Sequence, residues 1–340
     1  MNNMGVLSNR RTVLEVFKID LENNLLNTSN NFFSQNYKKT KILYHYSTMS
    51  SLKAIVENQT LFCSNSAYLN DKREYNYGLD LFKDALKKKL IESVAGIETN
   101  IINSVLKRLN EKNVSNHFAT CFSLEGDLLS QWRAYADDGK GISIGFDRKK
   151  LIEGFDNIAK GFYIEYNLIN QLKLVEILIK QIFDFYIEKF EILNNLESEG
   201  SLYDELSQEI NELIDKYIGL FKHNSFAEEK EFRFETSIDR QFNHSLESVS
   251  YRIGKNNLLV PYKTLSTNYA LEKERLKDNL EKLEAFEKSN NLKIKKLPIA
   301  QIIIGPSLDF ELNKHSIKDF LIKNDYSDVE IIPSDVPYRI

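Results

Sequence analysis

Short apolar runs alternate with longer helical patterns along most of this chain. Apolar or alternating runs bounded by turn residues predict strands at 42–46, 60–64, 117–123, 141–147, 161–167, 230–236, 258–263, 301–306 and 329–332. Between these runs, apolar residues recur every three or four positions, which predicts helices. The helical ranges are 12–25, 52–56, 79–109, 128–136, 168–194, 201–221, 268–289 and 309–323.

This order of elements predicts an α+β fold with a central mixed or antiparallel sheet. Residues 1–40 are rich in Asn and Ser and form an expected N-terminal helical arm, whereas residues 41–340 are expected to form a single α+β domain. Two helical insertions are expected in that domain. One spans residues 168–222, and the other, at 268–290, is almost wholly charged and predicts a projecting helix or half of a hairpin.

Composition restricts the class of protein. The chain has 340 residues, of which 42% are hydrophobic, and a formal net charge of −4. A near-neutral chain of this kind is neither a disordered tail nor a general nucleic-acid binder, although a local basic patch remains compatible with it. Cys63 and Cys121 are too few for a disulfide scaffold, and neither a secretory signal nor a membrane segment is recognisable. A cytoplasmic protein without membrane contact is therefore expected.

Several common catalytic motifs are missing from the sequence. It contains no GxxxxGK[ST] phosphate loop, no GxGxxG fingerprint and no HExxH helix, and its GxSxG string, GISIG at 141–145, lies within a predicted strand and not at the strand-to-helix turn of a nucleophile elbow. The five histidines are scattered, and apart from His117, which has Cys121 four residues later, none has a second His or a Cys nearby at the spacing of a local metal site. Classical nucleotide hydrolysis and zinc chemistry are therefore not expected, and no metal site is predicted.

His45 is the first candidate for chemistry. It lies within a predicted strand between Tyr44 and Tyr46, so its side chain points to the face opposite both tyrosines. One interpretation is a half-buried histidine whose hydrogen bonds are satisfied within the fold. The other is a ring nitrogen offered to a ligand at the end of a strand, beside the hydroxyl of Ser47.

The segment FAEEKEFRF is the densest candidate. Glu229, Glu231 and Arg233 lie at i, i+2 and i+4, so a strand here would place all three side chains on one face. A solvated strand face with stabilising charges is one interpretation. The other is a carboxylate oriented by the arginine, which could stabilise a cationic transition state or accept a hydrogen bond from a sugar hydroxyl.

Two weaker clusters complete the set. Asp71 and Arg73 lie in a polar loop, where Asp71 could simply cap the following helix. Trp132, the only tryptophan, lies close to Arg133 and Tyr135, and a tryptophan is more often part of a core than a platform for a ligand.

The order of these motifs is more informative than any one of them. LYHYSTMSSLKAIVENQTLFCSNSAYLNDKREY is followed by CFSLEGDLLSQWRAYADDGKGISIGFD, then FAEEKEFRF, IIIGP and a final PYR. This series resembles the bacterial domain-of-unknown-function family 2971 over about residues 42 to 340. The family name itself implies no activity.

A more distant similarity is to the ADP-ribosyltransferase fold, including the branch that modifies nucleic acids. It rests on a strand bearing His45, followed at once by a helix and the TLFCS strand, with a strand bearing Glu231 much later. The resemblance implies that His45 and Glu231 are catalytic, with Glu229 as the alternative glutamate that holds the ribose while the glycosidic bond opens. The remaining residues that it implies for NAD binding, beside His45, are Tyr46, Ser47, Tyr135 and Arg233, with Ser123 as a further possibility for the position that supports the nicotinamide.

Three functions follow as hypotheses. The first is a bacterial enzyme that uses NAD, either an ADP-ribosyltransferase with a protein or nucleic-acid target or an NAD glycohydrolase, acting in phage defence or as a toxin. The second is a non-catalytic module that senses a nucleotide or a phage component, with the long helices serving signalling or homo-oligomerisation. The third is a metal-dependent nuclease with Glu229, Glu231 and Asp71 as ligands.

Overall fold

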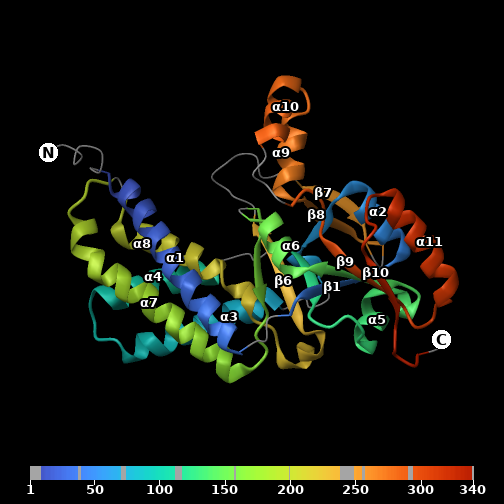
Figure 1. The fold of residues 1–340 in the computed structure, drawn as a ribbon. Helices are drawn as coiled ribbons and strands as arrows, with labels where there is room; N and C mark the ends of the chain where they lie inside the picture. The colour runs from blue at the N-terminus through green and yellow to red at the C-terminus, as the bar shows by residue number, and fades with distance from the viewer. Residues whose placement is uncertain are drawn as a thin grey trace. The chain divides into compact units, whose positions relative to one another are not determined.

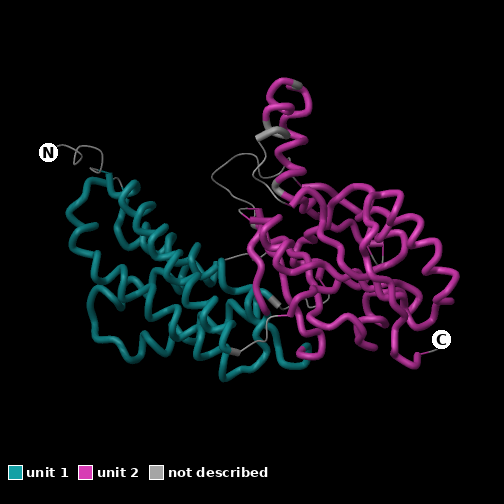
Figure 2. Tube along the Cα trace, viewed as in Figure 1, with its two compact units in different colours: residues 1–38, 73–114, 164–226 teal, residues 39–72, 115–163, 227–340 magenta. Residues whose placement is uncertain are grey.

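The chain divides into two compact units, which Figure 2 distinguishes by colour. A computed structural model describes residues 9–36, 40–69, 74–111, 117–156, 158–198, 200–237, 249–254, 257–289 and 294–338. Unit 1 comprises residues 1–38, 73–114 and 164–226, and its described elements are helical. Unit 2 comprises residues 39–72, 115–163 and 227–340 and contains every described strand.

Unit 1 is built from five α-helices along the described part of the chain. They are α1 (Arg10–Asn36), α3 (Glu74–Glu92), α4 (Ile97–Asn110), α7 (Leu168–Asn194) and α8 (Leu202–Asp215), followed by a 3-10 turn, η3 (Ile218–Leu220) (Figure 1). The bounds predicted for α7 are confirmed, because its apolar residues recur at helical spacing and face the core. No described helix is both long and apolar enough to cross a membrane.

Three helical predictions for unit 1 need correction. The range 79–109 is two helices, because α3 ends at Glu92 and α4 begins at Ile97, with Gly96 as its N-cap residue. The helix predicted at 201–221 ends earlier, at Asp215, and continues as η3. The N-terminal helix is longer than predicted, since buried apolar residues continue to Phe33.

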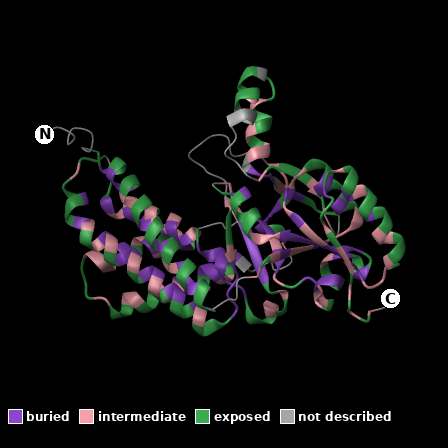
Figure 3. Ribbon diagram, in the orientation of Figure 1, coloured by how far each residue is buried: buried purple, intermediate pink, exposed green. Residues whose placement is uncertain are grey.

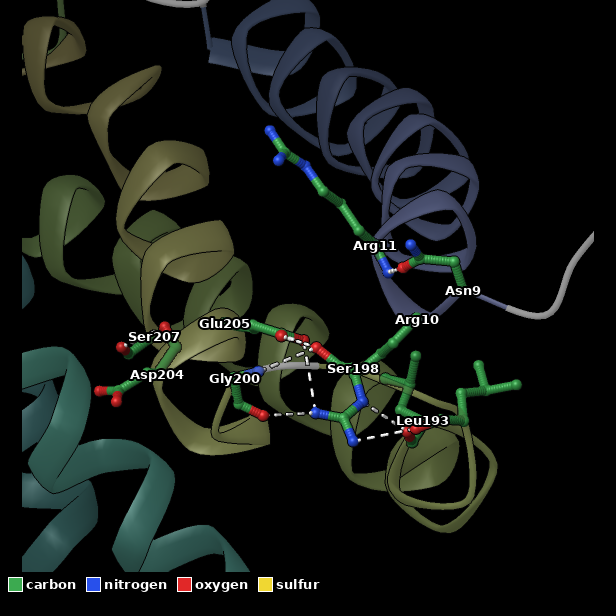
Figure 4. A network of polar contacts seen from close by, with 10 residues as sticks. Asn9, Arg10, Arg11, Leu193, Ser198, Gly200, Asp204, Glu205 and Ser207 are labelled. Carbon is green, nitrogen blue, oxygen red and sulfur yellow. Dashed lines mark hydrogen bonds and ion pairs between the residues drawn. The ribbon is translucent and has the colours of Figure 1, made fainter.

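Arg10 joins three segments of unit 1 through its buried guanidinium (Figure 4). Its Nε donates to the carbonyl oxygen of Leu193 at 2.9 Å, and its Nη2 donates to that of Leu196 at 3.1 Å. Its Nη1 donates to the carbonyl oxygen of Gly200 at 3.1 Å and lies 3.5 Å from a carboxylate oxygen of Glu205. One side chain thus adds hydrogen bonds to a carbonyl group in the last turn of α7 and to two in the segment after it, and holds the start of α8 beside them.

Unit 2 contains a ten-stranded mixed sheet. Its strands are β1 (Ile42–Ser47), β2 (Leu61–Asn65), β3 (His117–Ser123), β4 (Ile142–Asp147), β5 (Lys160–Tyr163), β6 (Glu231–Ser237), β7 (Ser250–Ile253), β8 (Leu259–Leu265), β9 (Ile299–Ile304) and β10 (Glu330–Pro333). The pair β9 and β10 is parallel, and the other pairs are antiparallel. The predicted α+β class with a mixed sheet is therefore confirmed.

Two strand predictions differ from the structure. The strand predicted at 161–167 ends at Tyr163, and β7 was not predicted because its side chains are mostly exposed.

The sheet forks at β3. One edge of β3 pairs with β6 along its whole length, from His117 opposite Ser237 to Ser123 opposite Glu231. The strands β1 and β2 therefore share the other edge: β1 pairs near Ser123 and β2 pairs near Ala119. From this fork, one wing continues through β1, β4, β9 and β10, and the other through β2, β8 and β7.

The described helices of unit 2 are short. They are α2 (Met49–Asn58), α5 (Leu129–Tyr135), α6 (Arg148–Gly154), α9 (Asn268–Leu276), α10 (Leu280–Ser289) and α11 (Phe310–Lys323). The charged segment predicted as a projecting helix or half of a hairpin forms α9 and α10, which extend away from the sheet (Figure 1). Buried positions lie along the strands (Figure 3). Among the buried side chains, the ring of Phe122 packs edge-to-face on that of Phe234, with ring centroids 5.7 Å apart.

We expect the substitution Gly78→Ala to destabilise unit 1, although alanine normally favours a helix over glycine. A Cβ atom at Gly78 would lie 2.0 Å from the carbonyl oxygen of Ile218, so the backbone of η3 would have to move. The expected loss is about 1 to 3 kcal/mol in the free energy of unfolding, measured by urea denaturation. Asn76→Ala, at an exposed site of the same helix, is the control, and equal stabilities for the two variants would contradict the close contact.

Candidate functional site

The strand registers divide the predicted site residues between the two faces of the sheet. Tyr44 lies opposite Ser123, and Ser123 lies opposite Glu231, so these three side chains share a face. Because side chains alternate along a strand, Tyr46 and Arg233 belong to the same face. Helix α5 packs on it through Trp132, and we call it the α5 face. His45 and Ser47 point to the opposite face.

His45 satisfies a carbonyl group at the fork of the sheet. Its Nδ1 lies 3.1 Å from the carbonyl oxygen of Cys121, which can only accept a hydrogen bond, so Nδ1 carries the proton and Nε2 is an acceptor. Burial lowers the pKa of the imidazole, which therefore stays neutral at neutral pH. The bonding of Nδ1 agrees with the structural interpretation of His45, and the structure does not place this residue with Glu231.

Glu231 and Arg233 form a buried ion pair on the α5 face. Their side chains are 4% and 0% exposed, and Nη2 of Arg233 lies 2.7 Å from Oε1 of Glu231. The Nε of Arg233 donates to the same oxygen at 2.8 Å. Both N–H groups thus point to one carboxylate oxygen, and the charge of Glu231 is balanced inside the fold.

Glu229 is not on the strand, in contrast to the prediction. It ends the 3-10 turn η4 (Asn224–Glu229), and the next residue, Lys230, has a left-handed backbone with φ of 46°, which separates Glu229 from β6. Its carboxylate accepts a hydrogen bond from the hydroxyl of Tyr135 at 3.0 Å, and its carbonyl oxygen accepts one from the hydroxyl of Ser123 at 2.9 Å. The strand pattern predicted the wrong position for Glu229, because alternation along the sequence does not reveal where a turn precedes the strand.

Tyr46 supports the loop before α5. Its ring meets that of Trp132 edge-to-face, with centroids 5.0 Å apart, and its hydroxyl donates to the carbonyl oxygen of Glu125 at 2.9 Å. The same hydroxyl accepts from the backbone N–H of Leu128 at 2.8 Å. Burial raises the pKa of this phenol well above its ordinary value, so it is a neutral donor.

Tyr135 and Glu229 are thus the predicted residues that the structure brings into direct contact while both remain partly exposed. The ion pair of Glu231 and Arg233 lies on the same α5 face.

Asp127 is a residue that the sequence reasoning missed: its carboxylate accepts a hydrogen bond from the indole N–H of Trp132 at 2.6 Å. A buried indole N–H needs an acceptor, so the carboxylate five residues before Trp132 was the signal in the sequence for this hydrogen bond.

The described residues contain no group of three or more His, Cys, Asp or Glu side chains that could hold a metal ion. The nuclease hypothesis also needs Asp71, which, like Arg73, lies outside the described residues. Nothing in the described part of the chain favours that hypothesis.

Residues 131–234 match the model of a protein family described as "Protein of unknown function (DUF2971)". The matched segment begins inside α5 and ends inside β6, so it contains Tyr135, Glu229, Glu231 and Arg233 but not His45. No curated protein matches the chain, and no solved structure does.

We expect the ion pair of Glu231 and Arg233 to be needed for folding. Arg233→Met should cost about 3 to 5 kcal/mol of unfolding free energy, because it leaves a buried carboxylate without its counter-charge. The double variant Glu231→Leu, Arg233→Met should cost less than the sum of the two single variants, as measured by denaturant titration. Additive losses would contradict direct coupling, and Arg275→Met, in an exposed pair with Glu272, should have little effect.

Unfolding stability should depend on pH through His45. Because the pKa of this residue is lowered in the folded state, the unfolded chain takes up a proton first as the pH falls through about 6.5, and stability is lost below that pH. One such proton contributes at most about 1.4 kcal/mol per pH unit. His45→Asn keeps an N–H donor but cannot titrate, so its stability should fall less between pH 6.5 and 5.

The control for this measurement is His315→Asn, since the side chain of His315 is 83% exposed. It should retain the wild-type loss of stability below pH 6.5. A loss in His45→Asn as steep as that of the wild type would show that other groups cause it.

Proposed function

We propose that unit 2 is an NAD-using enzyme, either an ADP-ribosyltransferase or an NAD glycohydrolase, in which Glu229 is the catalytic carboxylate. The observation that carries the proposal is the hydrogen bond of 3.0 Å from the hydroxyl of Tyr135 to Oε1 of Glu229. It orients a partly exposed carboxylate using a residue 94 positions away in the sequence.

The proposal assigns different roles to the two glutamates. Glu231 is 4% exposed and its charge is balanced by Arg233, so it organises the fold near the site instead of meeting the ribose. Glu229 lies at the end of a turn before β6 and retains partial exposure. A carboxylate that must approach a substrate needs that exposure, which favours Glu229 among the alternatives of the sequence.

The chemistry suits this arrangement. When the bond between C1′ of the ribose and the nicotinamide nitrogen breaks, its electron pair leaves with nicotinamide, and positive charge develops on the ribose. A carboxylate held beside the ribose stabilises that charge. The hydroxyl of Tyr135 fixes the orientation of the carboxylate; water or a nucleophilic group on a macromolecule then forms a bond to C1′ and releases its proton to solvent.

The similarity to the ADP-ribosyltransferase fold supports the proposal through the order of elements alone, because His45 and Glu231, the two residues on which it rests, have structural roles in this proposal. The series β1, α2 and β2, with a glutamate-bearing β6 later in the chain, has the order of elements on which that similarity rests. His45 lies on the opposite face of the sheet, so in this proposal it stabilises the fork and is not paired with Glu229. Phage defence or toxicity is the proposed biological setting.

The test is the release of nicotinamide from NAD by the purified protein, together with transfer of radiolabel from NAD to protein or nucleic acid added from a bacterial extract. Glu229→Gln should lower the rate by about 100-fold, the magnitude typical of losing one electrostatic contact to a transition state. Tyr135→Phe should lower it less, because the carboxylate remains but is no longer oriented.

The matched control is Glu228→Gln, which changes the neighbouring exposed carboxylate and should leave the rate unchanged. Wild-type protein that neither releases nicotinamide nor transfers label would contradict the proposal. Binding of NAD without turnover would instead favour the non-catalytic sensing module.

A further inference from the structure

The C-terminal segment, residues 334–338, follows β10 and lies against the α5 face without regular secondary structure. The backbone N–H of Ser334 donates to the carbonyl oxygen of Ile304 at the end of β9, at 3.0 Å. Val336 packs against an apolar cluster whose members include Tyr46 and Trp132. The segment therefore covers the residues that seat α5 on the sheet.

Asp127 ties this segment to α5. One carboxylate oxygen accepts the indole N–H of Trp132 at 2.6 Å and the hydroxyl of Ser334 at 2.5 Å. The other oxygen accepts the backbone N–H of Asp335 at 2.7 Å. Hydrogen bonds to an ionised acceptor are stronger than neutral ones, so three donors from two distant segments are held at one carboxylate.

A second attachment holds the turn after α5. The hydroxyl of Tyr338 donates to the carboxylate of Asp138 at 2.7 Å. Asp137 and Asp138 have left-handed backbones, with φ of 48° and 52°, and Gly139 follows with φ of 85°. Non-glycine residues rarely adopt this conformation, and consecutive ones persist only where the surroundings hold them.

We infer that residues 334–338 form a C-terminal clasp that sets the position of α5, with Asp127 as its positioning residue. The clasp holds α5 on both sides, at Asp127 before the helix and at Asp138 after it. Tyr135, in the last turn of α5, is thereby kept in reach of Glu229. The clasp stands on these contacts alone, and its effect on NAD turnover rests on the proposed function.

Trp132 provides a direct measurement, because it is the only tryptophan of the chain and is fully buried. In a chain ending at Pro333, and in Asp127→Ala, its fluorescence should move to longer wavelength and become several-fold more sensitive to acrylamide. Asp127→Asn keeps a carbonyl oxygen as acceptor and should give an intermediate result. Asp335→Ala is the matched control: only the backbone N–H of Asp335 contacts Asp127, so its fluorescence should match the wild type.

Wild-type fluorescence and quenching in both the truncated chain and Asp127→Ala would overturn the clasp. If the truncated chain fails to fold by circular dichroism, the double variant Ser334→Ala, Tyr338→Phe decides the question by the same measurement. Clasp variants of an active enzyme should lose kcat, with a smaller change in KM; unchanged kinetics would overturn the effect of the clasp on turnover, whereas the fluorescence measurement decides the clasp itself. A fluorescence change in a protein that does not use NAD would keep the clasp and remove the proposed function.

Discussion

The pairing of β6 with β3 is the constraint on which the rest of unit 2 depends. It uses one edge of β3 from His117 to Ser123, so only the opposite edge is left for β1 and β2. Two strands that share one edge must diverge, and the sheet therefore forks. The same pairing places Arg233 opposite Cys121 and Glu231 opposite Ser123, which sets the buried ion pair on the face that α5 covers.

The fork explains why polar side chains are found in the middle of the sheet. Where neighbouring strands separate, backbone groups lose their usual ladder partners and need others. His45 supplies an N–H group to the carbonyl oxygen of Cys121, and the hydroxyl of Ser123 binds the carbonyl oxygen of Glu229. The structural role of His45 thus originates in the fork, whereas the bond from Ser123 holds the turn before β6, at the opposite edge of β3.

Prediction from sequence succeeded where one local periodicity dominates. The helix at 168–194 was predicted with its observed bounds, because its apolar residues recur at helical spacing without glycine or proline. Prediction failed where a break interrupts a long helical pattern, as between Glu92 and Ile97, or depends on one backbone angle, as at Lys230. The strand β7 was missed for another reason: exposed edge strands lack the buried apolar run by which strands are recognised.

By itself, the sequence determined the α+β class and the main helices and strands, and it named candidate residues for a site. Those properties depend on periodicity and composition, which are local. Only the tertiary structure decided which candidates meet: it joined Tyr135 to Glu229, enclosed Glu231 with Arg233, and left His45 on the other face. Strand register, edge pairing and the seating of α5 decide such contacts, and they bring together residues that are distant in the chain.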